Sequence, residues 1–291
     1  MSDTTLVQIG FATGSAGVPW EVRLARLEAL LGDLGNVVVA YSGGVDSSLL
    51  LKVATGVLGE KCLGVIGRSD SYSEDELRMA LAQAAEFGTR VEVVSTGELA
   101  DPNFRSNPVN RCYFCKTELY RELAVVASAR GAVILDGTIA DDVADWRPGR
   151  TAAAEAGVRS PLVECGFTKA DVRAAAAHLG VRSAAKPASP CLASRIPYGM
   201  EITREALRQV ELGERFLRSL GLSDVRLRHH GDVARIEAPI SEATILLDPA
   251  VRERLIAELR GLGYRFIALD LEGFRSGSLN RGIVDSKIAG T

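Results

Sequence analysis

The chain contains 291 residues, of which 47% are hydrophobic and 24% are charged. These fractions are typical of globular proteins and exclude disordered, collagen-like and other fibrous chains. The length suits one large domain or two modest ones. The 34 basic residues against 37 acidic ones give a net charge of −3, which disfavours a protein that grips nucleic acid mainly through its phosphates.

The five cysteines are too few, and too odd in number, for a disulfide scaffold. The N-terminal segment lacks the basic and apolar regions of a signal peptide, and no run approaches the roughly 18 apolar residues of a membrane helix. We therefore expect a soluble, cytoplasmic protein with no membrane partner. Its cysteines should be reduced, so a functional cysteine would be a nucleophile, a metal ligand or a sulfur carrier.

Hydrophobic periodicity predicts alternating helices and strands after a loose N-terminal arm at residues 1–19. The expected helices cover residues 20–34, 47–58, 74–87 and about 111–129, and the expected strands cover 36–40, 62–66, 90–94 and 132–135. Strands separated by helices of this length indicate βαβ units. We therefore expect an α/β domain at residues 20–200, with a parallel sheet covered by helices on both faces.

The pattern changes at Gly137, after which two long loops rich in Gly, Pro, Ser and Asp enclose one predicted helix over 168–178. Thr168 and Asp171 have the spacing of a capping box at the start of that helix. Residues 201–291 predict a smaller α+β domain for substrate binding or oligomerisation. Its expected elements are helices over about 203–219 and 242–260, two strands joined at His230-Gly231, and a last strand over 264–271.

The most specific motif directly follows the first predicted strand and leads into an apolar helix. It contains Ser42, Gly43, Gly44, Asp46, Ser47 and Ser48. Two adjacent glycines let consecutive N–H groups turn inward as an anion-binding nest, and serine hydroxyls add donors at the positive end of the helix. The Asp46 carboxylate beside the nest is a candidate ligand for a Mg²⁺ ion that bridges it to phosphate.

The spacing of this loop is neither that of a Walker A motif nor GxGxxG. The loop resembles the PP-loop of ATP pyrophosphatases, which implies that it holds the pyrophosphate of ATP while AMP is transferred to an acceptor oxygen. By the same resemblance, Ala40, Ser69 and Gly137 are expected among the nucleotide-binding residues.

Sequence context divides the cysteines into two groups. Cys62 opens an apolar strand and Cys165 precedes a helix cap, so we expect both to be packing residues. Cys112 and Cys115 form a CxxC pair, and Cys191 lies after a proline in a loop with a cation nearby, a setting that can expose a thiol and lower its pKa. Three thiolates leave one position open at a zinc ion, or fit an iron–sulfur cluster with one open iron.

A closer resemblance, to the LarE family, extends from about residue 20 to 280 through motifs that occur in order. They are SGGVDSS, NRCYFCKTELY, DGTIADD, KPASPCLASRIPYG, VRLRHHGDVARIE and LDLEGFRSG. The resemblance implies an ATP-dependent sulfur transferase that adenylates the carboxylates of pyridinium-3,5-biscarboxylic acid mononucleotide, releases pyrophosphate and forms thiocarboxylates. The product is a precursor of the nickel-pincer nucleotide cofactor.

The family is known in two versions, which differ in the source of sulfur. One sacrifices the sulfur of the cysteine matched by Cys191, and the other carries a 4Fe-4S cluster on three cysteines. Because this chain has Cys112, Cys115 and Cys191, it resembles the cluster version. The resemblance therefore implies ATP, Mg²⁺ and a 4Fe-4S cluster as cofactors, a small-molecule substrate, and a homo-oligomer.

Further charged and aromatic residues are candidates for the same site. Arg226 and Arg228 alternate along a strand and share one face, which suits phosphate binding, although an exposed charged strand face is the alternative. The resemblance adds Arg195 as a third ligand of the substrate phosphate. Candidate Mg²⁺ ligands are Glu214, Glu237 and Asp270; candidates along the cleft are Asp141, Asp142, Asp145, Trp146 and Tyr198.

Two other functions remain open at this level. A PP-loop tRNA thiolase can also use a CxxC pair and an iron–sulfur cluster, but the net charge of −3 makes nucleic acid an unlikely partner. A non-catalytic ATP- or metal-binding regulator is the second alternative, and it would release no pyrophosphate.

Overall fold

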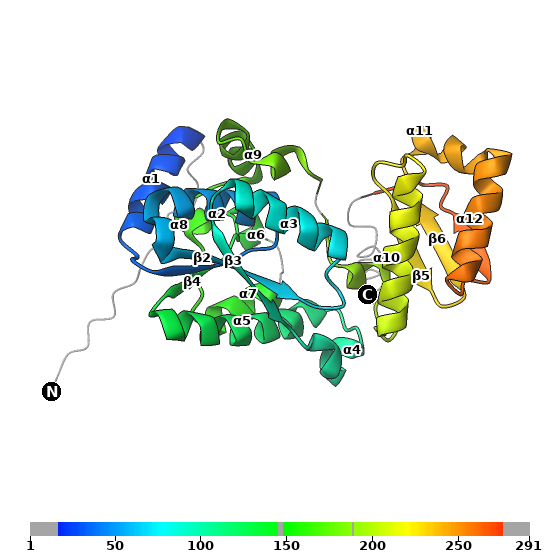
Figure 1. The fold of residues 1–291 in the computed structure, drawn as a ribbon, viewed down its shortest axis with the longest axis horizontal. Helices are drawn as coiled ribbons and strands as arrows, with labels where there is room; N and C mark the ends of the chain where they lie inside the picture. Colours follow the sequence, from blue (N-terminus) through cyan, green and yellow to red (C-terminus); the bar gives the residue numbers. More distant parts are fainter. Residues whose placement is uncertain (1–16, 145–147, 188, 276–291) are drawn as a thin grey trace, which may run out of the picture.

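The computed structural model describes residues 17–144, 148–187 and 189–275, which form two lobes (Figure 1). The larger lobe contains a four-stranded sheet in the order β3–β2–β1–β4, in which every neighbouring pair is parallel. Its strands are β1 (Val37–Ala40), β2 (Cys62–Arg68), β3 (Arg90–Ser95) and β4 (Val133–Leu135). The expected α/β class with a parallel sheet is confirmed.

Helices cover both faces of this sheet, as parallel strands joined by crossovers require (Figure 1). The main ones are α1 (Trp20–Gly32), α2 (Val45–Leu58), α3 (Glu74–Glu86), α5 (Arg111–Arg130) and α9 (Lys169–His178). Alternate residues of β1 face opposite sides: Val37 and Val39 pack in the core under α1, α2 and α9, and Val38 and Ala40 pack in the core over α5. The run of apolar residues in β1 therefore reflects burial on both faces.

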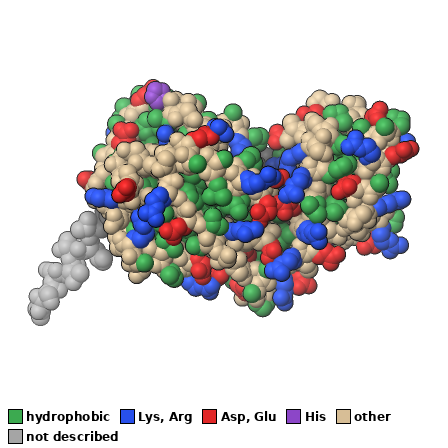
Figure 2. Space-filling view, in the orientation of Figure 1, with side chains coloured by type: hydrophobic (Ala, Val, Ile, Leu, Met, Phe, Trp, Pro, Cys, Tyr) green, Lys and Arg blue, Asp and Glu red, His purple; other side chains and the backbone are tan. Residues whose placement is uncertain are grey.

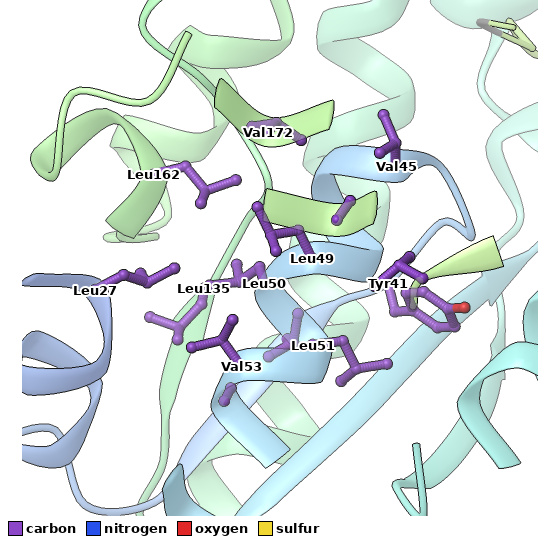
Figure 3. Packing of buried hydrophobic residues seen from close by; sticks show 14 of the residues in the cluster. Leu27, Tyr41, Val45, Leu49, Leu50, Leu51, Val53, Leu135, Leu162 and Val172 are labelled. Atoms are coloured by element: carbon purple, nitrogen blue, oxygen red, sulfur yellow. The ribbon is translucent and has the colours of Figure 1, made fainter. Parts of the chain in front are cut away.

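The core around α2 fixes the position of the loop that precedes this helix. Leu49, Leu50 and Leu51 are fully buried. In Figure 3 they lie among side chains from α1, β4 and the segment after residue 160. Because α2 is held on several sides, its first turn has a defined place at the carboxyl end of β1.

The smaller lobe contains a three-stranded sheet of β5 (Arg226–His230), β6 (Val233–Glu237) and β7 (Phe266–Leu269). β5 and β6 are joined at the predicted His230-Gly231 and form an antiparallel hairpin, and β7 pairs with β6 in parallel. The helices α10 (Arg204–Ser219) and α12 (Pro249–Gly261) contribute to a separate hydrophobic cluster in this lobe. The domain boundary at residue 200 stays a prediction.

Two expectations about secondary structure are wrong. The helix expected over 242–260 is interrupted: a short α11 (Ile240–Ala243) and the 3-10 turn η5 (Thr244–Leu247) precede α12. The reason is that Asp248 caps α12 through the amides of Ala250 and Val251, and Pro249 has no N–H with which to continue an earlier helix.

The segment after Gly137 contains more helix than the single one expected. The additional short helices are α6 (Asp141–Ala144), α7 (Pro148–Glu155) and α8 (Pro161–Glu164). The last two begin at a proline, which is tolerated in the first helical turn. The capping box of Thr168 and Asp171 at the start of α9 is confirmed.

Short helices and turns complete the two lobes. They are η1 (Gly59–Lys61), η2 (Glu98–Ala100), α4 (Pro102–Arg105), η3 (Arg182–Ala185) and η4 (Leu192–Arg195). None of the helices in the described part of the chain has the length and apolarity needed to cross a bilayer. Residues 1–16 of the expected N-terminal arm, Asp145 and Trp146 lie outside the described residues.

Candidate active site

The glycine loop after β1 is compact, and at Gly43 it leaves no space for a larger residue. Gly43 has φ +71°, and a Cβ at this position would lie 2.8 Å from the Cβ of Ala80 on α3. Gly44 caps α2 in an extended conformation. The hydroxyl of Ser47 accepts a hydrogen bond from the amide of Ser42 (3.2 Å) and lies 3.2 Å from the Gly44 carbonyl oxygen, to which it donates. The loop therefore folds back on the first turn of α2 and lies at the positive end of this helix.

Gly137, after β4, packs directly on this loop. A Cβ at Gly137 would lie 2.7 Å from the backbone nitrogen of Ser47, 2.9 Å from its Cα and 3.1 Å from the carbonyl carbon of Asp46. These are backbone atoms, so they cannot move aside as the end of a flexible side chain can. Gly137 thus allows two distant segments of the chain to meet at the beginning of α2.

Two cavities open beside the glycine loop. The first has a volume of about 950 Å³ and lies over the carboxyl ends of the strands. Its lining includes the predicted residues Ala40, Ser42, Gly44, Asp46, Ser47, Cys112, Gly137, Asp142 and Tyr198. Among its walls are also apolar residues from the end of β2, including Val65 and Ile66. The structure thus gathers most of the expected nucleotide-binding residues around one cavity.

The second cavity has a volume of about 940 Å³ and lies between the larger lobe and α10. It is lined by the predicted residues Cys191, Arg195 and Glu214 and by several bases: Arg78, Lys169, Arg173, Lys186, Arg215 and Arg218. Figure 2 shows Lys and Arg side chains beside Asp and Glu where the two lobes meet. Ser42, Gly44, Asp46 and Tyr72 line both cavities, so the glycine loop forms a common wall.

Asp46 has a cationic partner that the sequence reasoning missed. The Nζ atom of Lys169 lies 2.8 and 2.7 Å from the two carboxylate oxygens of Asp46. Lys169 is the first residue of α9, and its own amide donates a hydrogen bond to Asp141 (2.7 Å). The sequence did offer a signal for Lys169: this lysine directly follows the predicted N-cap Thr168, and that helix lies between the two long loops.

Two serines do not lie where the sequence reasoning expected them. Ser48 is fully buried: its hydroxyl accepts a hydrogen bond from Gln83 (2.6 Å), and its amide donates to the Gly44 carbonyl. Consecutive helical residues point in directions about 100° apart, so Ser47 faces the loop and Ser48 faces the core. Ser69 likewise lines neither cavity, and its hydroxyl lies 3.0 Å from that of Ser71.

The cysteines separate as expected into packing residues and residues near the cavities. Cys62 and Cys165 are buried in the main core, and burial raises the pKa of each thiol to about 11. Cys112 is exposed at the first cavity and Cys191 is exposed at the second. Cys115 is half-buried at the first turns of α5. The packing role of Cys62 and Cys165 is confirmed.

The environment of Cys115 disfavours its thiolate. Burial and, after it, the carboxylate of Glu98 raise the pKa of the Cys115 thiol. Glu98, which the sequence reasoning also missed, is 2% exposed and accepts a hydrogen bond from the Ser71 hydroxyl (2.8 Å). Within residues 17–144, 148–187 and 189–275, however, no three Cys, His, Asp or Glu side chains are gathered so that they could hold a metal ion. The cluster on three cysteines stays a prediction.

The arginines assigned to the substrate phosphate are buried rather than exposed. Arg195, Arg226 and Arg228 are 1%, 7% and 6% exposed, so the alternative of a solvated charged strand face is wrong. Arg228 pairs with Glu237 (2.7 Å) and donates to the Ser194 carbonyl (2.8 Å). Burial of these charges is tolerated because each guanidinium has a partner of opposite charge or a backbone acceptor.

The three candidate Mg²⁺ ligands besides Asp46 contact arginines. Glu214 forms ion pairs with Arg195 (2.7 Å) and Arg218 (2.6 Å). Burial by itself would raise the pKa of Glu214, but these two cations outweigh burial and lower it. Glu237 and Asp270 share Arg235, at 3.0 and 3.3 Å. Their role as metal ligands stays a prediction.

A parallel sheet with a glycine nest after its central strand β1, and an aspartate in the first turn of the next helix, is the arrangement of a PP-loop α/β protein. No protein-family model matches the chain. The chain is 41% identical over 269 residues to the pyridinium-3,5-bisthiocarboxylic acid mononucleotide synthase of Lactiplantibacillus plantarum, covering 92% of this chain and 97% of that protein.

Two uncharacterised proteins are also similar. The chain is 44% identical over 262 residues to the protein slr1717 of Synechocystis, covering 90% of this chain and 98% of that one. It is 27% identical over 242 residues to the protein MJ0830 of Methanocaldococcus jannaschii, covering 83% and 91%. The identity to the synthase extends over nearly the full length of both chains, and the chain therefore belongs to the LarE family.

Proposed function

We propose that the protein is an ATP-dependent sulfur transferase that converts the carboxylates of pyridinium-3,5-biscarboxylic acid mononucleotide into thiocarboxylates. The observation that carries this proposal is the common wall of the two cavities, formed by Ser42, Gly44, Asp46 and Tyr72. ATP in the first cavity and the mononucleotide in the second would meet at this wall. Holding two reactants in that geometry replaces a bimolecular encounter by a reaction within one complex.

The first chemical step is adenylation. A substrate carboxylate oxygen attacks the α-phosphorus of ATP, the bond to the bridging oxygen breaks, and pyrophosphate leaves with the electron pair. The product is an acyl adenylate, whose AMP is a far better leaving group than the original oxygen. The nest at Gly43 and Gly44 and the positive end of α2 would stabilise the charge that develops on the departing pyrophosphate.

We assign assistance of this departure to Asp46 and Lys169. The assignment is supported by the position of Lys169, which lines the second cavity and whose Nζ contacts Asp46 at the common wall, where its positive charge would neutralise part of the charge on the phosphates. Asp46 would hold a Mg²⁺ ion, which supplies additional charge neutralisation when it is bound.

The second step is the transfer of sulfur. A sulfur nucleophile attacks the acyl carbon, AMP leaves, and a thiocarboxylate or a thioester remains. If the Cys191 thiol is the nucleophile, its proton passes to solvent on attack and a thioester forms. A base then takes the proton from Cα of Cys191, the Cβ–S bond breaks with its electron pair on sulfur, and the thiocarboxylate leaves while dehydroalanine remains. The alternative sulfur source is a 4Fe-4S cluster, for which Cys112, Cys115 and Cys191 are the candidate ligands and which would supply sulfide without loss of protein sulfur. Because these side chains are not gathered in this structure, the Cys191 loop would have to approach α5 to complete the site.

The experiment that tests the function measures pyrophosphate and AMP with ATP, Mg²⁺ and the pyridinium mononucleotide, using protein purified without oxygen. We expect both products to depend on the mononucleotide, and a thiocarboxylate to form. Pyrophosphate release that is independent of this substrate, or triggered instead by tRNA, would refute the proposal. The intact mass of the protein then identifies the sulfur source: loss of the mass of hydrogen sulfide indicates sacrifice of Cys191, and an unchanged mass with bound iron indicates the cluster.

A further inference from the structure

The loop that carries Cys191 is held by the guanidinium of a fully buried arginine. Nη1 of Arg195 lies 2.6 Å from the carbonyl oxygen of Pro190 and 3.3 Å from that of Cys191, and it is also 2.9 Å from the Ser194 hydroxyl. Arg195 itself is 1% exposed. The arginine therefore donates to the carbonyl of the peptide that precedes Cys191 and to that of the peptide that follows it, and the thiol stays exposed.

The other edge of the Arg195 guanidinium is anchored to the smaller lobe. Nε lies 2.7 Å from one oxygen of Glu214, and Nη2 lies 3.0 Å from the other, in a bidentate pair. Glu214 is in turn held by the amide of Leu227 on β5 (3.1 Å). Such a pair is directional and rigid because both groups are planar. Arg195 thus links the Cys191 loop to α10 directly, and through Glu214 to β5.

The larger lobe holds the same loop at the next residue. The amide of Leu192 donates a hydrogen bond to the carbonyl oxygen of Ser71 (2.9 Å). The Ser71 hydroxyl is fixed by the buried Glu98. The backbone around Cys191 is therefore attached to both lobes, whereas its side chain projects without burial into the second cavity.

We propose that Arg195 is a positioning residue for Cys191, which fixes the sulfur-bearing loop between the lobes. Each of its three nitrogens donates to a protein acceptor: Nε and Nη2 to the Glu214 carboxylate, and Nη1 to the loop carbonyls. Sulfur transfer requires the nucleophile to lie about 3–3.5 Å from the acyl carbon, and a misplacement of about 1 Å can lower the rate roughly 100-fold. The inference deepens the proposed function and rests on it for the role of Cys191.

The test combines Arg195→Lys with two readouts. Lysine keeps a charge beside Glu214 but cannot bind the carboxylate and the loop carbonyls together. We expect hydrogen exchange in the peptide covering residues 190–196 to accelerate about tenfold or more, as loss of charge-assisted hydrogen bonds predicts. The rate of thiocarboxylate formation should fall on the order of 100-fold, with the KM for the pyridinium mononucleotide within about twofold of the original.

The matched control is Arg265→Lys, which alters an exposed Arg–Asp pair, Arg265 with Asp232, at the far side of the smaller lobe's hairpin from the loop. It should leave exchange at residues 190–196 unchanged. If Arg195→Lys instead raises KM strongly while kcat and loop exchange are unchanged, Arg195 is a phosphate ligand and the inference is wrong.

A second measurement needs no variant, so it still tests the inference if Arg195→Lys does not fold. In the unaltered protein, the Leu192 amide should exchange far more slowly than a free peptide, and exchange there at the free rate would also refute the inference. Because exchange requires no turnover, this outcome is independent of the proposed function. That function fails separately, when the unaltered protein forms no thiocarboxylate.

Discussion

A methyl group at Gly137 should disturb the nucleotide site more than its size suggests. In Gly137→Ala the new carbon would lie 2.7 Å from the Ser47 nitrogen and 2.9 Å from its Cα, both backbone atoms of α2. An ordinary carbon contact is about 3.5–4.0 Å, so the end of β4 and the start of α2 must separate by roughly 1 Å. Overpacking of this kind costs about 1–3 kcal/mol of folding free energy.

The same displacement moves the glycine loop, so the loss of function should exceed the loss of stability. A shift of about 1 Å at a positioned group can reduce a rate roughly 100-fold. We therefore expect Gly137→Ala to lower substrate-dependent pyrophosphate release by about this factor and to weaken ATP binding, measured by calorimetric titration. Urea unfolding gives the stability change separately.

Gly56→Ala is the matched control for this substitution. Gly56 lies in the same helix α2, is exposed, and has no atom within 4 Å of the position of an added Cβ. Alanine should there stabilise the helix by about 0.5–1 kcal/mol and leave ATP binding unchanged. The reasoning would be refuted if Gly137→Ala retained both the stability and the ATP affinity of the unaltered protein.

Three further substitutions test other parts of the structure. Lys169→Met removes the cation from Asp46, so pyrophosphate release should fall about 10–100-fold, whereas Lys52→Met, whose ammonium lies over a phenylalanine ring outside both cavities, should have no effect. The folded pKa of Cys62 is about 11 against an ordinary value of 9.0, so the folded state holds this proton more tightly. Stability should therefore fall as pH rises from about 9 towards 11, and Cys62→Ala should flatten that part of the Tm–pH curve. Asp248→Ala should cost about 1 kcal/mol in urea unfolding, because it removes the cap of α12; an unchanged midpoint would contradict the assigned cap.

Much of the larger lobe could be predicted because its signals are local. The strand run before Ser42, the two glycines and the apolar helix after Asp46 lie within one short stretch, and backbone conformation there depends mainly on neighbouring residues. The capping box of Thr168 and Asp171 is local in the same sense, and it was confirmed. The break at Pro249 in the helix expected over 242–260 could also be predicted from the proline, but the apolar pattern continues across it and indicates one helix.

The sequence alone thus determined the fold class, the position of the glycine loop and the division of the cysteines into buried and accessible ones. Only the tertiary structure decided which charges meet, because ion pairs join residues that the chain keeps apart. Lys169 reaches Asp46 across 123 positions, and Arg228 reaches the Ser194 carbonyl across 34. An arginine is usually exposed, and it becomes buried only where a distant segment of the chain supplies an acceptor for its guanidinium.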